Sequence, residues 1–131
     1  MKVLANDGIS QSGIDALQAK GFEVITTNVA QEQLISYINE NKITVLLVRS
    51  ATTARKDLVD SCPSLKIIGR GGVGMDNIDV DYAREKGLKV INTPASSSAS
   101  VAELVFAHLY GGVRFLHDSN RNMPLEGESN F

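Results

Sequence analysis

Two short segments of the sequence combine residue types that bind anions. The first is Arg49-Ser50, which directly follows the apolar run of residues 43–48. Arginine offers a planar fork of donors that matches carboxylate or phosphate oxygens, and serine adds a hydroxyl donor. The alternative is a solvent-exposed arginine at the start of a loop, which is common after strands. The pair is therefore a candidate anion site.

The second segment, Gly69-Arg70-Gly71-Gly72-Val73-Gly74, has the G-x-G-x-x-G spacing of dinucleotide-binding loops. Its context differs, because such loops open a long crossover helix and need an acidic residue at the end of the next strand. Here Met75-Asp76-Asn77 intervenes, and the next predicted strand ends in Ile91-Asn92. The lysine of a Walker loop is also missing. The segment predicts either a glycine-rich turn whose backbone donors hold an anion beside Arg70, or a tight turn without a ligand.

The elements that position these segments follow from hydrophobic patterning. Runs rich in β-branched residues predict strands over residues 3–5, 23–26, 43–48, 66–68 and 89–91. Helical patterns alternate with them, the last being a short one over residues 79–86. This alternation predicts an α/β fold, a doubly wound parallel sheet with helices on both faces, because each crossover passes over one face. Ligands then gather at the carboxyl ends of the strands, where both candidate segments lie. If the two strands are neighbours, we expect the side chains of Arg49 and Arg70 to converge there.

The alternation of predicted strands and helices ends in the C-terminal part of the sequence. The Ser-x-x-Glu spacing of residues 100–103 is typical of a capping box, so we expect a helix to begin there. It carries one apolar stripe with Phe106 and Tyr110 on another side, which predicts that it is covered from more than one direction. Gly111-Gly112 should bend or fray it. Residues 120–131 are polar and resemble a linker, and we expect a further domain to follow.

Composition excludes several classes of function. The 131 residues carry 13 Lys and Arg against 15 Asp and Glu, a net charge of −2 with no basic block, which argues against nucleic-acid binding. The longest aliphatic run, Val45 to Val48, is far shorter than the roughly 20 residues of a membrane helix. Asp7 interrupts the start too early for a secretory signal. A single cysteine, Cys62, fits a reducing compartment, so we expect a cytoplasmic protein.

Three segments in order resemble the D-isomer-specific 2-hydroxyacid dehydrogenases. They are Val48-Arg49-Ser50-Ala51-Thr52, then Ile67-Ile68-Gly69-Arg70-Gly71-Gly72-Val73-Gly74-Met75-Asp76-Asn77-Ile78-Asp79, then Asn92-Thr93-Pro94 leading to Ser100-Val101-Ala102-Glu103-Leu104. The resemblance implies a flavodoxin-like substrate-binding domain over residues 1–97 and a crossover helix over residues 98–118. It implies a linker, or the start of a missing nucleotide-binding Rossmann domain, over residues 119–131.

Within the family the resemblance is greatest to members that act on 3-phosphoglycerate. It implies NAD-dependent oxidation of this small anionic substrate to 3-phosphohydroxypyruvate, for serine biosynthesis, by a homo-oligomer such as a dimer. The family's catalytic Arg, Glu and His are expected beyond residue 131, and no metal is implied. His108 and His117, in or just beyond the crossover helix, are interpreted as surface or packing residues.

The resemblance also assigns binding roles residue by residue. Substrate contacts are implied for Arg49, Ser50, Arg70, Gly71 and Gly72, the nicotinamide is implied to face Val73, and Ser97 is implied to border the same cleft. Asp76 and Asn77 are interpreted as structural, because short polar side chains can tie a turn to its own backbone.

Other proteins with a similar sheet fit less well. A phosphoacceptor receiver domain needs an aspartate at the end of the third strand, where Arg49 stands. A flavodoxin needs a hydroxyl-rich phosphate loop where this sequence has Asn6-Asp7-Gly8, and aromatic residues around the flavin, whereas Trp is absent. The remaining alternatives are another D-2-hydroxyacid dehydrogenase, or a non-enzymatic ligand-sensing or corepressor member of the same family.

We expect the 131-residue chain by itself to show no turnover, because hydride transfer needs the nicotinamide held against C2 of the substrate. Mixed with NAD and 3-phosphoglycerate, it should produce no NADH absorbance above the blank. Calorimetric titration with NAD should likewise show no specific site, because segment 69–74 lacks the context of a dinucleotide loop. A stoichiometric isotherm in the micromolar range would contradict this interpretation.

Overall fold

The computed structural model describes the backbone of residues 1–126 and the side chains of residues 1–123. The chain divides into two compact units, Met1–Pro94 and Ala95–Phe131. No helix within the described residues is long and apolar enough to cross a membrane.

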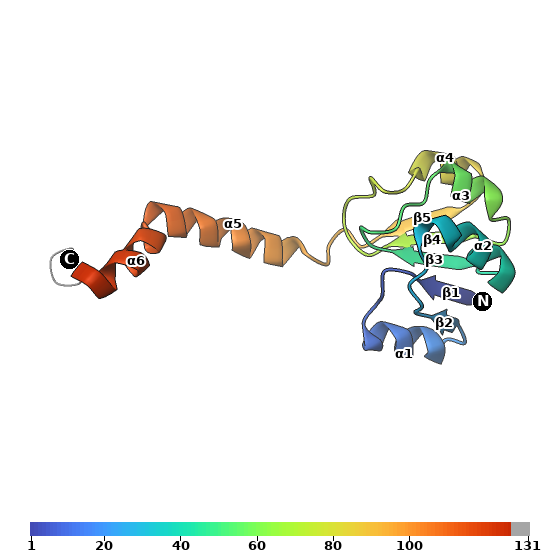
Figure 1. Ribbon diagram of the computed structural model, residues 1–131, viewed down its shortest axis with the longest axis horizontal. Coiled ribbons are helices and arrows are strands. Elements are labelled where there is room, and N and C mark those ends of the chain that lie inside the picture. Colours follow the sequence, from blue (N-terminus) through green and yellow to red (C-terminus); the bar gives the residue numbers. More distant parts are fainter. Residues whose placement is uncertain (127–131) are drawn as a thin grey trace. The chain divides into compact units, whose positions relative to one another are not determined.

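The first unit is a five-stranded parallel sheet of order β2-β1-β3-β4-β5 (Figure 1). Its strands are β1 (Lys2–Ala5), β2 (Glu23–Ile25), β3 (Val45–Val48), β4 (Ile67–Arg70) and β5 (Lys89–Asn92). Its helices are α1 (Gln11–Ala19), α2 (Gln31–Asn41), α3 (Lys56–Ser61) and α4 (Val80–Glu85). The predicted α/β fold is confirmed, and the strand order is that of flavodoxin-like proteins.

The helices cover the two faces of the sheet unequally. Helices α2, α3 and α4 lie on one face, whereas α1 lies on the other face, beside β1 and β2 (Figure 1). Ser10 is the N-cap of α1, and its hydroxyl accepts the Gly13 N–H at 3.3 Å.

The core lies between the sheet and the three helices α2, α3 and α4. In-register pairing places Leu4, Leu46, Ile68 and Val90 in one row across four strands. All four are buried, and they pack with α2 side chains such as Leu34. The apolar face of each helix closes over this row, which removes it from water.

The next row along the strands faces the other way, because side chains alternate across a sheet. It consists of Ala5, Leu47, Gly69 and Ile91, again paired in register. Ile91 is 46% exposed, and Leu47 is only half-buried. Gly69 belongs to β4, although the glycine-rich segment was expected to follow that strand.

The second unit consists of α5 (Ser98–Val113) and α6 (Leu116–Glu126). The capping-box prediction was wrong, because α5 begins before Ser100 and the Val101 N–H already bonds to the Ser97 carbonyl at 3.0 Å. The helix continues through Gly111-Gly112 and ends at Val113, just past the expected weak point. Phe115 then adopts a left-handed φ of 51°, which separates the two helices.

Helix α6 occupies residues for which a polar linker was expected. The described part of that predicted linker is therefore helical, while residues 127–131 lie outside the described residues. A polar sequence gives no amphipathic stripe, so its helix leaves little signal in the hydrophobic pattern.

Truncation of two adjacent leucines on β3 tests which face of the sheet the helices α2, α3 and α4 cover. Leu46→Ala should lower the free energy of unfolding by about 3 kcal/mol, because the truncation leaves a cavity under α2 and α3. Leu47→Ala, on the open face, should cost only about 1 kcal/mol. Urea unfolding measures both changes, and equal losses would contradict the assignment of the two faces.

Candidate functional site

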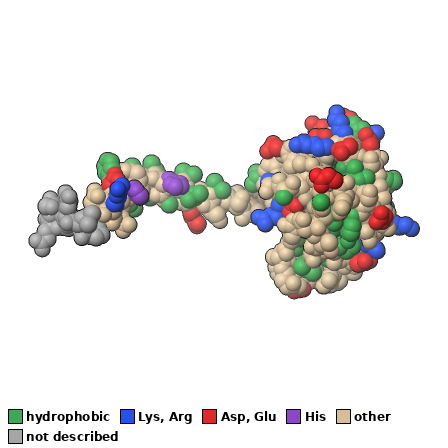
Figure 2. Space-filling model, in the orientation of Figure 1, with side chains coloured by type: hydrophobic (Ala, Val, Ile, Leu, Met, Phe, Trp, Pro, Cys, Tyr) green, Lys and Arg blue, Asp and Glu red, His purple; other side chains and the backbone are tan. Residues whose placement is uncertain are grey.

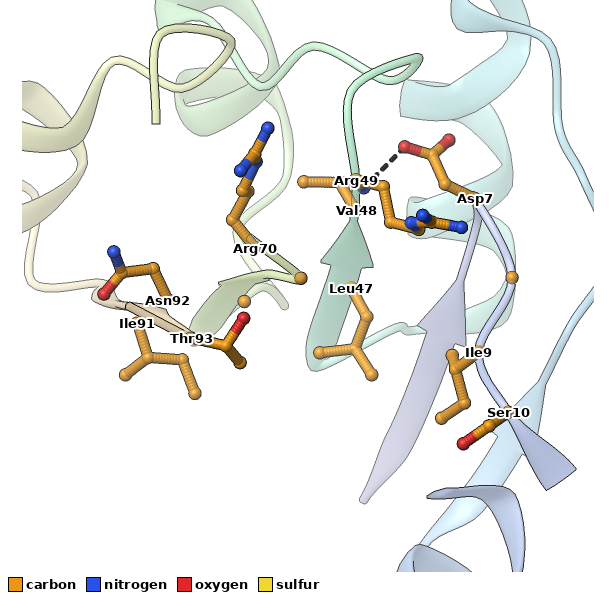
Figure 3. Close-up of a pocket in the computed structure, with 13 residues that line it drawn as sticks. Asp7, Ile9, Ser10, Leu47, Val48, Arg49, Arg70, Ile91, Asn92 and Thr93 are labelled. Carbon is orange, nitrogen blue, oxygen red and sulfur yellow. Dashed lines mark hydrogen bonds between the residues drawn. The ribbon is translucent and has the colours of Figure 1, made fainter. Parts of the chain in front are cut away.

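A pocket of about 580 Å³ lies at the carboxyl ends of β1, β3, β4 and β5 (Figure 3). Four segments line it: residues 7–10, 47–49, 69–71 and 91–93. Its apolar floor comes from the open row of the sheet, with Leu47 and Ile91 on either side of Gly69. The pocket thus lies at the sheet edge where the topology predicted a ligand site.

Both candidate arginines line this pocket, but their side chains point in different directions (Figure 3). Arg70 is the last residue of β4 and pairs with Val48, whereas Arg49 is the residue after that partner. Because side chains alternate along a strand, Arg70 leaves the sheet on the helix-covered face and Arg49 on the other. The expected convergence of the two guanidinium groups is absent from this arrangement.

Neither arginine forms an ion pair with an acid among the described residues. The three ion pairs among the described residues are Lys2–Glu23, Arg55–Asp79 and Lys86–Asp60. Arg70 also keeps its Nε buried without a hydrogen-bond partner. Two positive charges at the edge of one pocket are therefore available to an anion.

The Arg70 guanidinium lies close against the backbone of Gly72. A Cβ atom placed on Gly72 would be 1.9 Å from Nη1 of Arg70 and 2.6 Å from its Cζ. Any side chain at this position would therefore displace the arginine. Gly72 is the residue that allows Arg70 its present position.

The glycine-rich turn offers fewer backbone donors than expected. The Gly71 N–H donates to Val48 O at 2.9 Å, and the Gly72 N–H donates to Arg70 O at 3.0 Å. The end of β5 holds the same turn, because Asn92 Nδ2 donates to Val73 O at 2.7 Å. Among the described residues, the N–H groups of Val73 and Gly74 donate to no protein group, so these two amides of the turn are left for a ligand.

Segment 49–52, which contains Arg49 and Ser50, is held by side chains from other loops. The Asp7 carboxylate accepts the Arg49 N–H at 2.6 Å (Figure 3). It also accepts the Thr52 N–H at 3.1 Å and the Thr52 hydroxyl. Asn77 Nδ2 donates to the carbonyls of Arg49 and Thr52 at 2.9 and 2.7 Å. Asn77 therefore ties a distant loop, although we expected it to tie its own turn.

The pKa of Asp7 reflects this setting. Partial burial acts to raise it, but the hydrogen bonds from the Thr52 hydroxyl and from backbone N–H groups outweigh burial, and the net pKa lies below its ordinary value of 3.8. Asp7 is thus held as an anion whose oxygens are turned toward segment 49–52.

The other predicted residues lie in several places. Ser50, Gly72 and Val73 neighbour the lining residues in sequence, and Ser97 is the N-cap of α5 in the second unit. The two histidines are exposed, one on α5 and one on α6 (Figure 2). Within the described residues, no group of three or more His, Cys, Asp or Glu could hold a metal ion.

Three residues that hold the site were not identified as site residues from the sequence. They are Asn6, Asp7 and Asn92, each at or just beyond the end of a strand. The available signal was their position, because short polar side chains after buried strands can satisfy loop main chain.

Comparison with known proteins shows the family. The sequence profile described as "D-isomer specific 2-hydroxyacid dehydrogenase, catalytic domain" matches residues 3–119. The chain belongs to this family. It is 40% identical over 114 residues to D-3-phosphoglycerate dehydrogenase of Methanocaldococcus jannaschii, which covers 87% of this chain and 21% of that protein.

A relative with a different name is equally similar in sequence. Hydroxypyruvate reductase of Thermotoga maritima is 40% identical over 116 residues, covering 88% of this chain and 37% of that protein. This chain therefore spans between about a fifth and two fifths of these two relatives. Among solved structures, an acyclic imino acid reductase in complex with NADPH and D-Arg has a TM-score of 0.82 at 24% identity, covering 100% of this chain and 43% of that one.

The pH dependence of the free energy of unfolding should depend on Asp7. A carboxylate with a lowered folded-state pKa stabilises the fold above pH 3.8, and this contribution is lost as the pH falls through the folded-state pKa. Asp7→Asn should therefore lower the free energy of unfolding at pH 6, and the difference from wild type should shrink below pH 3.8. Urea unfolding at a series of pH values measures this difference, and a gap that widens toward acid would refute the assignment.

Proposed function

We propose that this chain is the substrate-binding part of an NAD-dependent D-3-phosphoglycerate dehydrogenase. The observation that carries the proposal is the pair of arginines at one pocket edge, Arg49 and Arg70, neither of which is paired with an acid among the described residues. A phosphorylated hydroxy acid is an anion at both ends, so it can use two separate cations. The M. jannaschii relative, which bears this enzyme's name, supports the choice of substrate.

The divergent arginines are compatible with binding one substrate. They stand at the strand ends, beyond which no sheet separates the two faces, and arginine side chains have several rotatable bonds. In the proposal, Arg49 and Ser50 take one anionic end of the substrate and Arg70 takes the other. Gly71 and Gly72 then bring the main chain close to the substrate.

The glycine-rich turn of segment 69–74 would also lie beside the cofactor. The exposed Val73, whose N–H donates to no described protein group, would border the nicotinamide of NAD, and Ser97 would border the cleft. NAD would accept the hydride from C2 of the substrate. Segment 69–74 by itself does not supply a dinucleotide site, so most of the cofactor contacts belong to a nucleotide-binding domain outside this chain.

The proposed enzyme is a cytoplasmic homo-oligomer of serine biosynthesis. Support for self-association comes from α5, whose large apolar side chains are each more than half exposed (Figure 2). These side chains belong to Val101, Leu104, Val105, Phe106, Leu109, Tyr110 and Val113.

A hydroxypyruvate reductase is the second candidate, because the T. maritima relative is as similar as the phosphoglycerate dehydrogenase. The two candidates differ in whether the pocket recognises a phosphate. D-glycerate is 3-phosphoglycerate without its phosphate, so the two compounds form a matched pair. Titration of the ¹⁵N-labelled chain, followed by amide chemical shifts, should give a lower Kd for 3-phosphoglycerate. Equal values for the two ligands would favour the unphosphorylated substrate.

The arginines should account for that preference. Arg49→Ala or Arg70→Ala removes a charge-assisted contact worth on the order of 2 kcal/mol, and should weaken 3-phosphoglycerate binding by about 30-fold. Arg49→Lys should restore part of the affinity, because the charge returns without the planar fork. Arg84→Ala removes an equal charge from the last turn of α4 and should leave the Kd unchanged. If both pocket variants kept the wild-type affinity, neither arginine would contact the ligand.

A further inference from the structure

Segment 49–52 has no regular secondary structure, yet both of its ends are fixed. Asp7 accepts the N–H groups of Arg49 and Thr52, and Asn77 donates to the carbonyls of the same two residues. Two side chains thus satisfy all four main-chain polar groups at the first and last residues of the segment. These hydrogen bonds take the place of the strand-to-strand hydrogen bonds, which end with β3 at Val48.

Asp7 is linked through Thr52 to a network of buried hydrogen bonds. The Thr52 hydroxyl, which donates to Asp7, also accepts a hydrogen bond from Asn6 Nδ2 at 2.9 Å. The Asn6 side chain is buried, and it exchanges hydrogen bonds with the N–H and the carbonyl of Val29 at 2.8 and 3.0 Å. The loops after β1, β2 and β3 are therefore joined through consecutive polar side chains.

Between the fixed ends, Ser50 and Ala51 are exposed. The directions of the Arg49 guanidinium and the Ser50 hydroxyl therefore depend on a main chain that Asp7 and Asn77 hold at its two ends, with a further interaction of Asp7 with the Ala51 N–H. Asp7 lines the pocket, but its carboxylate would repel an anionic ligand, and its hydrogen bonds run to segment 49–52 instead. Its position beside an anion site needs an explanation other than ligand contact.

We infer that Asp7 and Asn77 are positioning residues, which hold segment 49–52 so that Arg49 and Ser50 face the ligand while they touch no ligand atom themselves. The inference rests on the proposed function for the identity of the ligand. The fixing of the segment can be measured without any ligand.

The side-chain chemistry predicts an order of effects. Asp7→Ala removes every acceptor that the segment uses. Asp7→Asn keeps one oxygen for the two N–H groups and leaves the Thr52 hydroxyl proton without its acceptor, so it is a partial rescue. Asn77→Asp has nearly the same shape as the wild type but turns acceptors toward two carbonyls, so it should be as disruptive as Asn77→Ala.

Ligand affinity is the first readout, measured on the 131-residue chain with 3-phosphoglycerate and with inorganic phosphate. Asp7→Ala should weaken binding of either probe roughly tenfold, since a small misplacement of a binding group is costly. Asp7→Asn should lose clearly less. Asp81→Asn, which removes an exposed acid in the first turn of α4, should match wild type.

A double-mutant cycle separates positioning from loss of stability. If Asp7 acts through Arg49, adding Asp7→Ala to Arg49→Ala should weaken binding less than twofold further. Full additivity would overturn the inference. So would an Asp7→Ala protein whose urea midpoint falls while the Kd of the folded protein stays at the wild-type value.

The ligand-free readout is the ¹⁵N order parameter of the Ser50 and Ala51 amides, which reports motion faster than nanoseconds. It should fall in Asp7→Ala and Asn77→Asp and stay unchanged in Asp81→Asn. If the wild-type chain binds neither probe, the proposed function fails, whereas the positioning inference is then decided by these amides. Unchanged order parameters in both variants would overturn it.

Discussion

The in-register pairing of parallel strands determines which side chains reach the pocket. Leu46, Ile68 and Val90 form one row under the helices, so the next row must face the open side of the sheet. The same alternation sends Arg70 and Arg49 to opposite faces. A slip of one residue in any strand would exchange the core row and the pocket row for that strand. Burial of the core row, which also includes Leu4 on β1, opposes such a slip.

Beyond the strand ends the structure depends on short polar side chains. Asn6 and Asp7 come from the loop after β1, Asn77 from the loop after β4 and Asn92 from the end of β5. Each of these side chains bonds main-chain groups of another segment. The partners are between 19 and 45 residues apart in the sequence. The sheet edge is therefore shaped by contacts that form only when the whole unit has folded.

This distinction explains what could be predicted from the sequence. The alternation of apolar runs predicted the parallel sheet, and predicted strands 23–26 and 89–91 differ from β2 and β5 by one residue at an end. Gly69 and Arg70 were left out of β4 because glycine has low strand propensity and arginine does not continue the apolar run, yet their pairing with β3 and β5 holds them there.

The details of the site required knowledge of distant partners. The role of Asn77 was misassigned because its acceptors lie 25 and 28 residues away. The convergence of the arginines was expected because each was placed after a strand, while their registers relative to one another were unknown. The capping-box motif predicted the wrong helix start because α5 begins before Ser100, so Ser100 and Glu103 both lie inside the helix.

The close contact between Gly72 and Arg70 has a consequence for how this pocket can diverge among related sequences. A methyl group at residue 72 would force the guanidinium to move, although alanine carries no charge and makes no ligand contact. The electrostatic potential of the pocket can therefore change without gain or loss of any ionisable residue. Two homologues with identical charged residues could differ in the anion they select through this one uncharged position.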